Sequence, residues 1–435
     1  MSTIRYAGRL AAAALLTAAA LSAQTASAAG FQLTEQSSLG AGRAYAGAGI
    51  VGDDLSAVHY NPAGMTLLPG TQMQAGSVWI EVNAEYEGDL GSSENGRYKG
   101  QAIPAGYITH QLTDDVWLGL GLTVPFGMGT DYSKGWEGAE RGYTSTILTF
   151  DINPNIAWKV NDFLSVGGGI SLQYAKAKLG AALYKDVGGT AVNAGNGKID
   201  ADSWDWGWNF GIMVSPTERL RLGLSYRSSI THDAEGDFDY APSAAAAAPR
   251  PPYGYGYGLS ATTFNSKATV KTPDTVMFTT TWEATDNLRL SSLIRWSKWS
   301  NFKTLTIKNE ASEMYESLGF GSKSYDNDWE DTWLFSVGAD YKLNDAWTVR
   351  GGVAYEKDPV SDNSKRMAVI PDTDRLWLSF GATWNASKNF QIDGGFSYLK
   401  GIGNRDLYDK VGGNPIGKYK SLDAVILGIQ GQYRF

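Results

Sequence analysis

Three histidines, His59, His110 and His232, could in principle support acid–base catalysis or metal binding. They are scattered along the chain and show no metal-ligand spacing. A serine hydrolase needs a serine that reaches a histidine, and the nearest candidate is His232, followed by Asp233 at the edge of a long loop. No Gly-rich segment follows a strand and opens a helix, so a phosphate cradle is not expected. We therefore expect no catalytic residue, no metal and no cofactor.

The composition indicates an exported chain that is rich in glycine and aromatic residues. Arg5 and Arg9 precede an apolar run that ends at Ala26-Ser27-Ala28, which is typical of a signal peptide over residues 1–28. The sequence holds 52 Gly, 15 Trp and 23 Tyr but no Cys, which excludes a disulfide scaffold and thiol chemistry. The formal net charge of −8 does not favour nucleic-acid binding.

Polar and apolar residues alternate in segments from residue 70 to the end of the chain. Trp204, Trp206 and Trp208, for example, alternate with Asp205 and Gly207. Such alternation predicts strands with one lipid-facing side. We count 14 segments, near 71–87, 101–110, 116–126, 143–158, 163–176, 203–215, 219–232, 266–284, 287–303, 330–343, 346–357, 375–385, 389–400 and 422–435.

The connections between these segments alternate between short and long. Tight turns such as Leu112-Thr113-Asp114-Asp115 and Leu343-Asn344-Asp345 contain Asx or Thr side chains that favour turns. Short periplasmic turns and long outer loops are typical of outer-membrane barrels. We therefore predict an all-β fold, a 14-stranded antiparallel transmembrane β-barrel over residues 70–435.

Residues 29–69 precede the first strand and show no regular alternation. Glycines recur there at positions 40, 42, 47, 49 and 52, where they allow positive φ and tight packing, and Asn61-Pro62 interrupts regular structure. We expect this segment to fill the lumen. The alternative is a flexible leader that lies outside the barrel.

Several motifs carry a family resemblance along the mature chain. They include Ala29-Gly30-Phe31-Gln32-Leu33, Gly40-Ala41-Gly42-Arg43-Ala44-Tyr45, Asn61-Pro62-Ala63 and Ile370-Pro371-Asp372-Thr373-Asp374-Arg375. Together they closely resemble the FadL family of outer-membrane transporters for long-chain fatty acids and aromatic hydrocarbons. The resemblance implies a monomeric barrel plugged by its N-terminal segment, the hatch, at residues 29–69.

The resemblance assigns roles to several residues of the hatch. It implies that Phe31, near the mature N-terminus, touches the cargo, although Phe31 could also simply anchor the plug. Gly30 beside it, and Asn61, Pro62 and Ala63 near the base of the hatch, are expected to take part in gating.

The third predicted strand is interrupted by a proline and a glycine. Pro125 removes a ladder donor, and Gly127 weakens pairing just beyond it. In the family, the corresponding strand bends inward and leaves an opening in the barrel wall. We therefore expect a lateral opening at Ala105, Val124, Pro125, Phe126 and Gly127, with an ordinary strand end as the alternative.

A carboxylate cargo favours a cation in the lumen, and fatty-acid members of the family use a lysine and an arginine. By resemblance the lysine is Lys303, just after Trp299 and Phe302, which we expect to contact ligand. No arginine stands at the other position near Ala181, and Lys178 is the expected substitute, with Lys176 as a second choice. A lone lysine can also be simply solvated or paired.

The sequence thus predicts a passive outer-membrane transporter of long-chain fatty acids or other hydrophobic compounds, and not an enzyme. Ligand would bind in the lumen, the hatch would rearrange, and the ligand would leave laterally through the wall. The expected surroundings are outer-membrane lipid and lipopolysaccharide in a Gram-negative bacterium. The alternatives are a substrate-specific aqueous porin and a lipase-type barrel.

Overall fold

The chain forms a closed antiparallel β-barrel in the computed structural model, which describes residues 29–89, 91–96, 100–187, 190–248, 258–317, 320–409 and 413–435. Closure occurs where β1 (Thr71–Gly88) pairs with β21 (Pro415–Arg434), while the other edge of β1 pairs with β3 (Gln101–Gln111). The wall has 14 strand positions, which confirms the count expected from the alternation. The predicted signal peptide, residues 1–28, lies outside the described residues.

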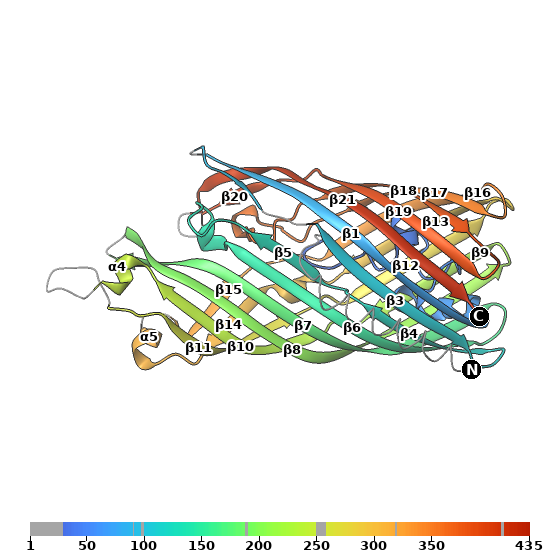
Figure 1. Ribbon diagram of the computed structural model, residues 1–435, viewed down its shortest axis with the longest axis horizontal. Helices are drawn as coiled ribbons and strands as arrows, with labels where there is room; N and C mark the ends of the chain where they lie inside the picture. The colour runs from blue at the N-terminus through green and yellow to red at the C-terminus, as the bar shows by residue number, and fades with distance from the viewer. Residues whose placement is uncertain are drawn as a thin grey trace.

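Several wall positions are built from two consecutive strands, so more strands than wall positions are labelled in Figure 1. Short strands β2 (Ser93–Asn95) and β20 (Asp406–Tyr408) add hairpins in the long loops. The remaining wall strands are β4 (Val116–Thr123) with β5 (Gly127–Asp131), β6 (Thr144–Lys159), β7 (Leu164–Val187), β8 (Thr190–Thr217), β9 (Leu220–Arg227) with β10 (Thr231–Pro242), β12 (Thr275–Glu283) with β11 (Thr262–Lys271), β13 (Leu288–Ser297) with β14 (Thr304–Asn309), β16 (Thr332–Lys342) with β15 (Ser322–Asp326), β17 (Trp347–Glu356), β18 (Arg375–Asn385) and β19 (Phe390–Gly401).

The helices are short and lie inside the barrel or in its loops. Within the described ranges, no helix has the length and apolar character needed to cross a bilayer. The helices are α2 (Ser38–Ala41), α3 (Ala57–Tyr60), α4 (Ala244–Ala247), α5 (Glu313–Ser317) and the 3₁₀ turns η1 (Pro62–Leu67), η2 (Ala139–Arg141), η3 (Trp299–Phe302) and η4 (Asn363–Lys365).

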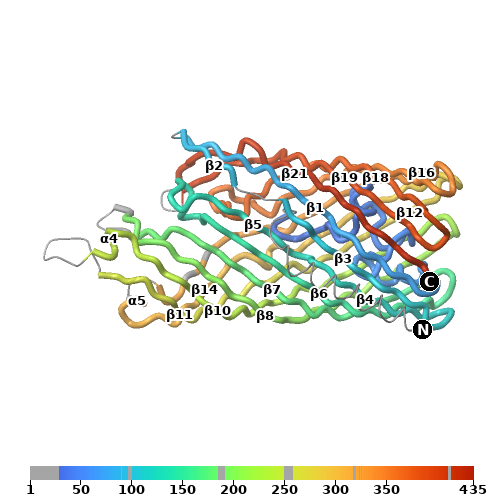
Figure 2. Tube along the Cα trace, in the orientation of Figure 1, coloured from blue at the N-terminus to red at the C-terminus, as the bar shows by residue number. Residues whose placement is uncertain are grey.

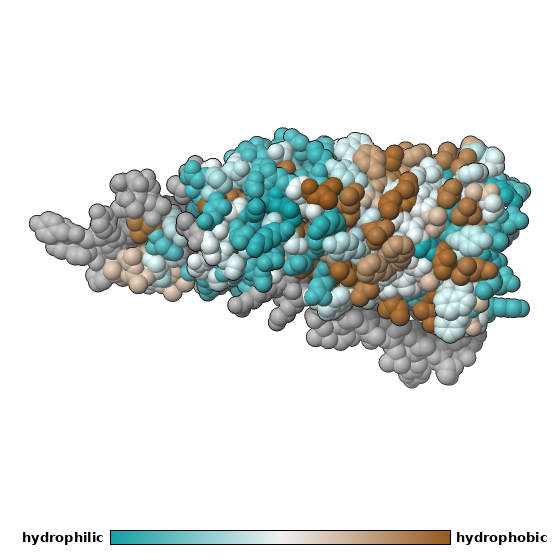
Figure 3. All heavy atoms as spheres, turned by 90° about the horizontal axis from the view of Figure 1, so that it is seen from above, coloured by the Kyte–Doolittle hydropathy of each residue, from teal (hydrophilic) through white to brown (hydrophobic). Residues whose placement is uncertain are grey.

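Large apolar side chains cover part of the outer wall. Trp206 of β8 is 70% exposed, and Ile429 of β21 is 66% exposed. Figure 3 shows hydrophobic residues gathered in a band over the half of the barrel nearer the short turns, with hydrophilic residues toward the other end. Lipid is the environment that such a surface requires.

The expected short turns are confirmed at one end of the barrel, opposite the long loops that carry α4 and α5 (Figure 1). The Asn161 side chain accepts hydrogen bonds from the backbone N–H groups of Phe163 and Leu164, and Asn344 does the same for Ala346 and Trp347. These Asx turns join neighbouring strands with few residues.

Strands β7 and β8 extend well beyond the segments expected at 163–176 and 203–215. Their outward side chains change from tryptophans at 204–208 to charged residues, with Asp200 paired to Lys176 and Lys178. The apolar alternation therefore ends where the hairpin leaves the apolar band, although the hydrogen-bonded ladder continues. The sequence pattern marked the lipid boundary and not the end of the strands.

Residues 29–69 lie inside the barrel, as the dark blue trace in Figure 2 shows. Nearly every residue of this segment is buried or half-buried. The helix α2 contacts β18, β19 and β21, whereas η1 contacts β6, β7 and β8 on another part of the wall. Gly47 illustrates the tight fit, because its φ is +72° and an added Cβ would lie 2.9 Å from Ser291.

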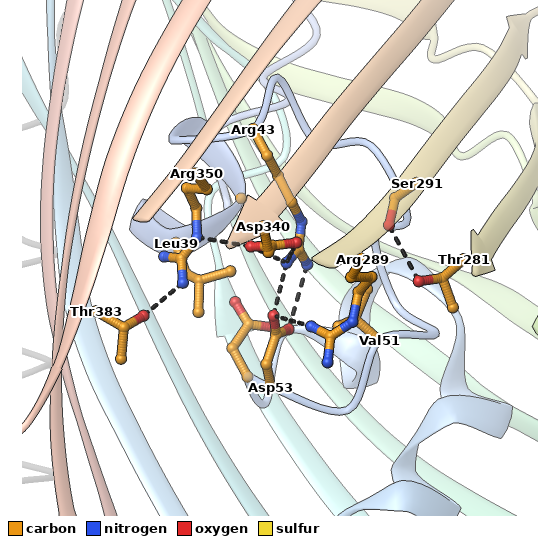
Figure 4. A network of polar contacts seen from close by, with 12 residues as sticks. Leu39, Arg43, Val51, Asp53, Thr281, Arg289, Ser291, Asp340, Arg350 and Thr383 are labelled. Atoms are coloured by element: carbon orange, nitrogen blue, oxygen red, sulfur yellow. Dashed lines mark hydrogen bonds and ion pairs between the residues drawn. The ribbon is translucent and has the colours of Figure 1, made fainter. Parts of the chain in front are cut away.

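A buried ionic network ties the middle of this segment to the wall (Figure 4). Arg43 Nη1 lies 2.6 Å from Asp53 Oδ2 and 3.4 Å from Asp340 of β16, which also binds Arg350 of β17 at 2.9 Å. Asp53 lies 3.4 Å from Arg289 of β13. Burial alone would raise the pKa of Asp53, but the Arg43 guanidinium holds it well below its usual range. Breaking a buried pair costs about 3–5 kcal/mol, so this part of the segment is firmly held.

Candidate ligand-binding site and wall break

The third wall position is interrupted between β4 and β5, at residues 124–126, here called the wall break. The ladder between β3 and β4 starts at Gly106 and does not reach Ala105. On the other side, the break stays joined to β6, because Thr149 N–H donates to the Phe126 carbonyl at 3.1 Å. Pro125 has no N–H to donate, which explains why the strand ends here. The interruption therefore separates β5 from β3 and not from β6.

Residues 29–36, here called the arm, lie along the wall break. Leu33 N–H donates to the Pro125 carbonyl at 2.8 Å, and Gly127 N–H donates to the Phe31 carbonyl at 2.9 Å. The Gln36 side chain adds two bonds to Val124, donating to its carbonyl at 2.7 Å and accepting from its N–H at 3.2 Å. The arm thus satisfies backbone groups that the broken strand leaves unpaired.

The wall break is closed in this structure. Ala105 is only 7% exposed and Val124 only 5% exposed. Phe126 and Gly127 are also buried, with Phe126 opposite Gln32 in an isolated antiparallel bridge. Residues 124–127 therefore lie together under the arm, whereas Ala105 shares a buried apolar cluster with Val58 of α3 and Met65 of η1.

Phe31 lies in an aromatic cluster, here called the Phe31 cluster, and is 2% exposed. Its ring centroid is 4.7 Å from Trp299, 5.5 Å from Phe302, 5.9 Å from Phe126 and 6.1 Å from Trp329. Three of these partners were predicted as site residues, whereas Trp329 was missed. Edge-on packing of this kind adds about 0.5–1.5 kcal/mol per pair to simple burial.

Gly30 fits the narrow space beside the Phe31 cluster. Its φ is +65°, and an added Cβ would lie 2.7 Å from Trp329 and 2.8 Å from Trp299. Its N–H donates to Asp372 Oδ2 at 2.5 Å. Asp372 belongs to the long loop between β17 and β18, whose residue Ile370 also packs in the Phe31 cluster. Sequence reasoning quoted Ile370 and Asp372 as motif residues but gave them no role.

Two apolar cavities lead toward Phe31 from the end with the long loops. The outer one has a volume of about 140 Å³ and is lined by Ile199 and Phe238, with Arg141 and Lys365 among its polar residues. The inner one, about 50 Å³, is lined by Phe31 itself. Both cavities are lined by Leu179, Leu305 and Met367, which therefore stand between them. The arrangement can accept an elongated apolar molecule.

The predicted cations do not join the Phe31 cluster. Lys303 follows η3 and is exposed, and its charge lowers the pKa of the nearby Asp328, together with Lys365, which hydrogen-bonds Asp328 and has the larger effect. Lys176, the second choice, borders the inner cavity but also pairs with Asp200 at 3.1 Å. Ala177 and Leu179 line that cavity, so alternation along β7 turns Lys178 to the outer face. There Lys178 pairs with Asp200 at 2.8 Å. The structure therefore does not bring Lys178 into the lumen.

The predicted gating residues Asn61, Pro62 and Ala63 lie away from the Phe31 cluster, against β8. The Asn61 side chain caps η1 by accepting from Ala63 N–H at 3.1 Å, and it donates to the Ile212 carbonyl at 3.0 Å. Pro62 occupies the first turn of η1, where its missing N–H costs nothing. In this structure the three residues fasten the segment to the wall.

His232 does not form a hydrolase relay. Its Nδ1 lies 3.0 Å from Asp205 and 3.2 Å from Ser203 Oγ, while its Nε2 lies 3.0 Å from Gln173. A relay needs the serine and the carboxylate on opposite ring nitrogens. Asp233 points to the other face and accepts from Thr269.

Glu35 places an ionisable carboxyl in the buried arm. Burial raises its pKa to about 7, and the Glu356 carboxylate adds to the shift, while Arg295 and Arg375 oppose it. The preceding residue, Thr34, accepts a 2.6 Å hydrogen bond from Arg295 at its Oγ1. The docked arm therefore binds a proton more tightly than a solvated arm does.

Comparison with known proteins agrees with this architecture. The family model described as outer membrane protein transport protein (OMPP1/FadL/TodX) matches residues 19–435. The long-chain fatty acid transport protein of Escherichia coli O6:H1 is 30% identical over 419 residues, covering 89% of this chain and 90% of that protein. The structure of a FadL homologue from Pseudomonas aeruginosa has a TM-score of 0.82 at 24% identity, covering 94% and 100% of the two chains. The toluene transporter TbuX of Ralstonia pickettii gives 0.68 at 18% identity, covering 94% and 99%. These two structures share the fold.

We predict that docking of the arm weakens as pH rises. Because the pKa of Glu35 is raised from 4.5 to about 7, the stabilisation is complete below 4.5 and is lost as pH rises through 7. The chain has no cysteine, so a single Leu33→Cys reporter can measure how often the buried arm is exposed to a thiol reagent. At about pH 8, adding Glu35→Gln should slow labelling by roughly tenfold or more, since one pKa unit is worth about 1.4 kcal/mol.

The labelling rate of the Leu33→Cys reporter is compared with and without Glu35→Gln at each pH. Both proteins carry the same thiol, so its own ionisation affects both rates equally. Their labelling rates should converge below about pH 4.5, the ordinary pKa of Glu35, where its carboxyl is protonated whether or not the arm is docked. Equal rates at every pH would show that Glu35 does not control docking of the arm.

Proposed function

The chain belongs to the outer membrane protein transport family OMPP1/FadL/TodX, and we propose that it carries long-chain fatty acids or similar hydrophobic compounds across the outer membrane. It is a β-barrel of the Gram-negative outer membrane. The observation that carries the proposal is the apolar route from the outer cavity to Phe31, which ends where the arm covers the wall break. The proposed unit is a monomer among outer-membrane lipid and lipopolysaccharide.

In this proposal, residues 29–69 act as a hatch with a moving part and a fixed part. The fixed part is held by the Arg43 network and by the Asn61 contacts with β8. The moving part is the arm, which is held by backbone bonds to the wall break, by side-chain bonds of Gln32, Thr34 and Gln36, by the Gly30 bond to Asp372 and by the packing of Phe31. Ligand that enters the inner cavity competes directly with Phe31 for the aromatic side chains of Trp299 and Phe302.

Displacement of the arm then exposes the wall break, and the cargo leaves sideways into the bilayer. The ladder that joins β4 to β3 stops before Ala105, so the gap lies between β3 and β5. A long acyl chain avoids water on this route, and each CH₂ kept out of water is worth about 0.8 kcal/mol. The lateral route therefore fits apolar cargo without an energy source.

The aqueous porin is the weaker alternative. A porin needs a water-filled lumen, whereas the buried residues of the segment 29–69 occupy this one, and Phe31 closes the inner cavity with aromatic neighbours. The ring packing around Phe31 favours an apolar binding site.

The transport proposal is tested with purified protein in lipid vesicles that trap a fluorescent fatty-acid sensor. We expect the protein to accelerate the entry of oleate and of an uncharged hydrocarbon without steady ion current in planar bilayers. Large stable currents together with no acceleration of oleate entry would favour the porin.

The lateral exit is tested by placing a charge in the wall break. Ala105→Arg and Val124→Arg should each reduce uptake by tenfold or more while the affinity for ligand changes little, because a buried guanidinium at the gap opposes an apolar chain. The matched control is Ala424→Arg, at an inward alanine of β21 that is 6% exposed. Uptake by the Ala105 and Val124 variants at the control's rate would contradict a lateral exit.

A further inference from the structure

A second small cavity lies on the other side of the arm from the Phe31 cluster. Its volume is about 40 Å³, and it is enclosed by the arm, by α3 and by residues of β8, β9, β12 and β13. Phe31 lines the inner apolar cavity, whereas the next residues, Gln32, Leu33 and Thr34, line this one. The arm is therefore a partition between an apolar cavity and a second cavity of different chemistry.

Two arginines line the second cavity, Arg227 from β9 and Arg295 from β13. Arg295 is anchored by a 2.7 Å ion pair with Glu356 through Nη2, and its Nη1 faces the arm. Arg227 donates to Ser171 at 2.7 Å and to the His59 carbonyl at 3.0 Å, and its side chain is 19% exposed. Arg227 Nη1 also lies 3.4 Å from Asp151, so both arginines are paired with carboxylates of the wall, and Arg295 Nη1 is the donor that faces the arm.

Oxygen atoms of the arm accept hydrogen bonds from two donors of β13, Arg295 in the cavity wall and Ser297 two residues further along the strand. Thr34 Oγ1 accepts from Arg295 Nη1 at 2.6 Å, and Gln32 Oε1 accepts from Ser297 Oγ at 3.0 Å. When the arm leaves, both donors lose these acceptors in a buried place, which is costly unless another acceptor arrives. When the arm leaves, it also takes the Glu35 carboxyl away from Arg295 and Arg375, whose positive charges act on that carboxyl in the docked arm.

We propose that departure of the arm opens a headgroup site in which Arg295, supported by Ser297 and Arg227, binds the carboxylate of an amphiphilic cargo. This inference rests on the proposed transport function and names the cargo class that the site selects. With the arm displaced, the acyl tail lies in the apolar cavity and the headgroup replaces the oxygens of Thr34 and Gln32. In this proposal Arg295 and Arg227 bind the carboxylate once the arm has moved, whereas Lys303 and Lys178 do not.

The test compares a fatty acid with its methyl ester, which has the same tail without the charge. The variant is Arg295→Met with Glu356→Gln, which removes both charges of the pair, while Arg375, which lies 3.8 Å from Glu356, keeps its ion pair with Asp372. In the wild type we expect faster vesicle entry of the acid than of the ester, at a concentration below saturation and at pH 8. In the variant this acid-to-ester ratio should fall by roughly tenfold or more, because a charge-assisted hydrogen bond is lost, while ester entry stays unchanged.

Two further variants test whether the effect depends on the charge of residue 295 and on its position. Arg295→Lys keeps the positive charge and should retain part of the preference for the acid. Arg219→Met with Asp286→Asn removes an exposed pair at the short turns, joined at 2.6 Å, and should leave the ratio unaltered. Each protein is first checked for the heat-modifiable migration of a folded barrel, and the Arg295→Lys comparison stands if the double variant fails that check.

The outcomes separate this inference from the transport proposal. If neither acid nor ester enters through the wild type, the transport proposal fails. If both enter and the ratio is the same in the wild type and in the Arg295 variants, transport stands and the headgroup site is refuted. An acid preference that depends on Arg295 supports both.

Discussion

The hydrogen bonds between the arm and the wall break are the constraint on which the rest of the structure depends. A strand interrupted at Pro125 leaves backbone groups of the barrel wall without ladder partners, and such groups are costly inside a membrane. The arm supplies those partners through Phe31, Leu33 and Gln36. In our proposal, opening the wall and moving the arm are therefore one event, because neither can happen while these bonds are intact.

This coupling divides the N-terminal segment into parts with different strengths. The Arg43 network consists of ion pairs, and breaking them leaves charges unpaired inside the protein, whereas the arm is held by hydrogen bonds and by the packing of Phe31. In our proposal, a ligand that fills the inner cavity replaces the packing of Phe31, and a carboxylate then replaces the oxygens of Thr34 and Gln32. The free energy of ligand binding would thereby move the arm, while the rest of residues 29–69 keeps the lumen filled.

The sequence predicted the wall better than the site. Lipid on one side imposes an alternation that can be read directly, as at Trp204, Trp206 and Trp208, and Pro125 marks the break because proline lacks an N–H. Lys178 was chosen for its nearness in sequence to the family's arginine position near Ala181, but alternation along β7 turns it to the outer face, where it pairs with Asp200. Trp329, Asp372 and Arg295 reach the arm from distant strands and loops, so no local pattern could assign them.

The central claim is that the arm must leave the wall break for cargo to pass. Gln32 and Phe126 face each other in an antiparallel bridge between flanking hydrogen bonds, a geometry with Cα atoms about 4.5 Å apart that suits a disulfide. In the cysteine-free chain, Gln32→Cys with Phe126→Cys forms a reversible lock. Our account predicts that fatty-acid entry into vesicles stops when the pair is oxidised and returns when it is reduced. Undiminished entry through the fully oxidised protein would contradict it.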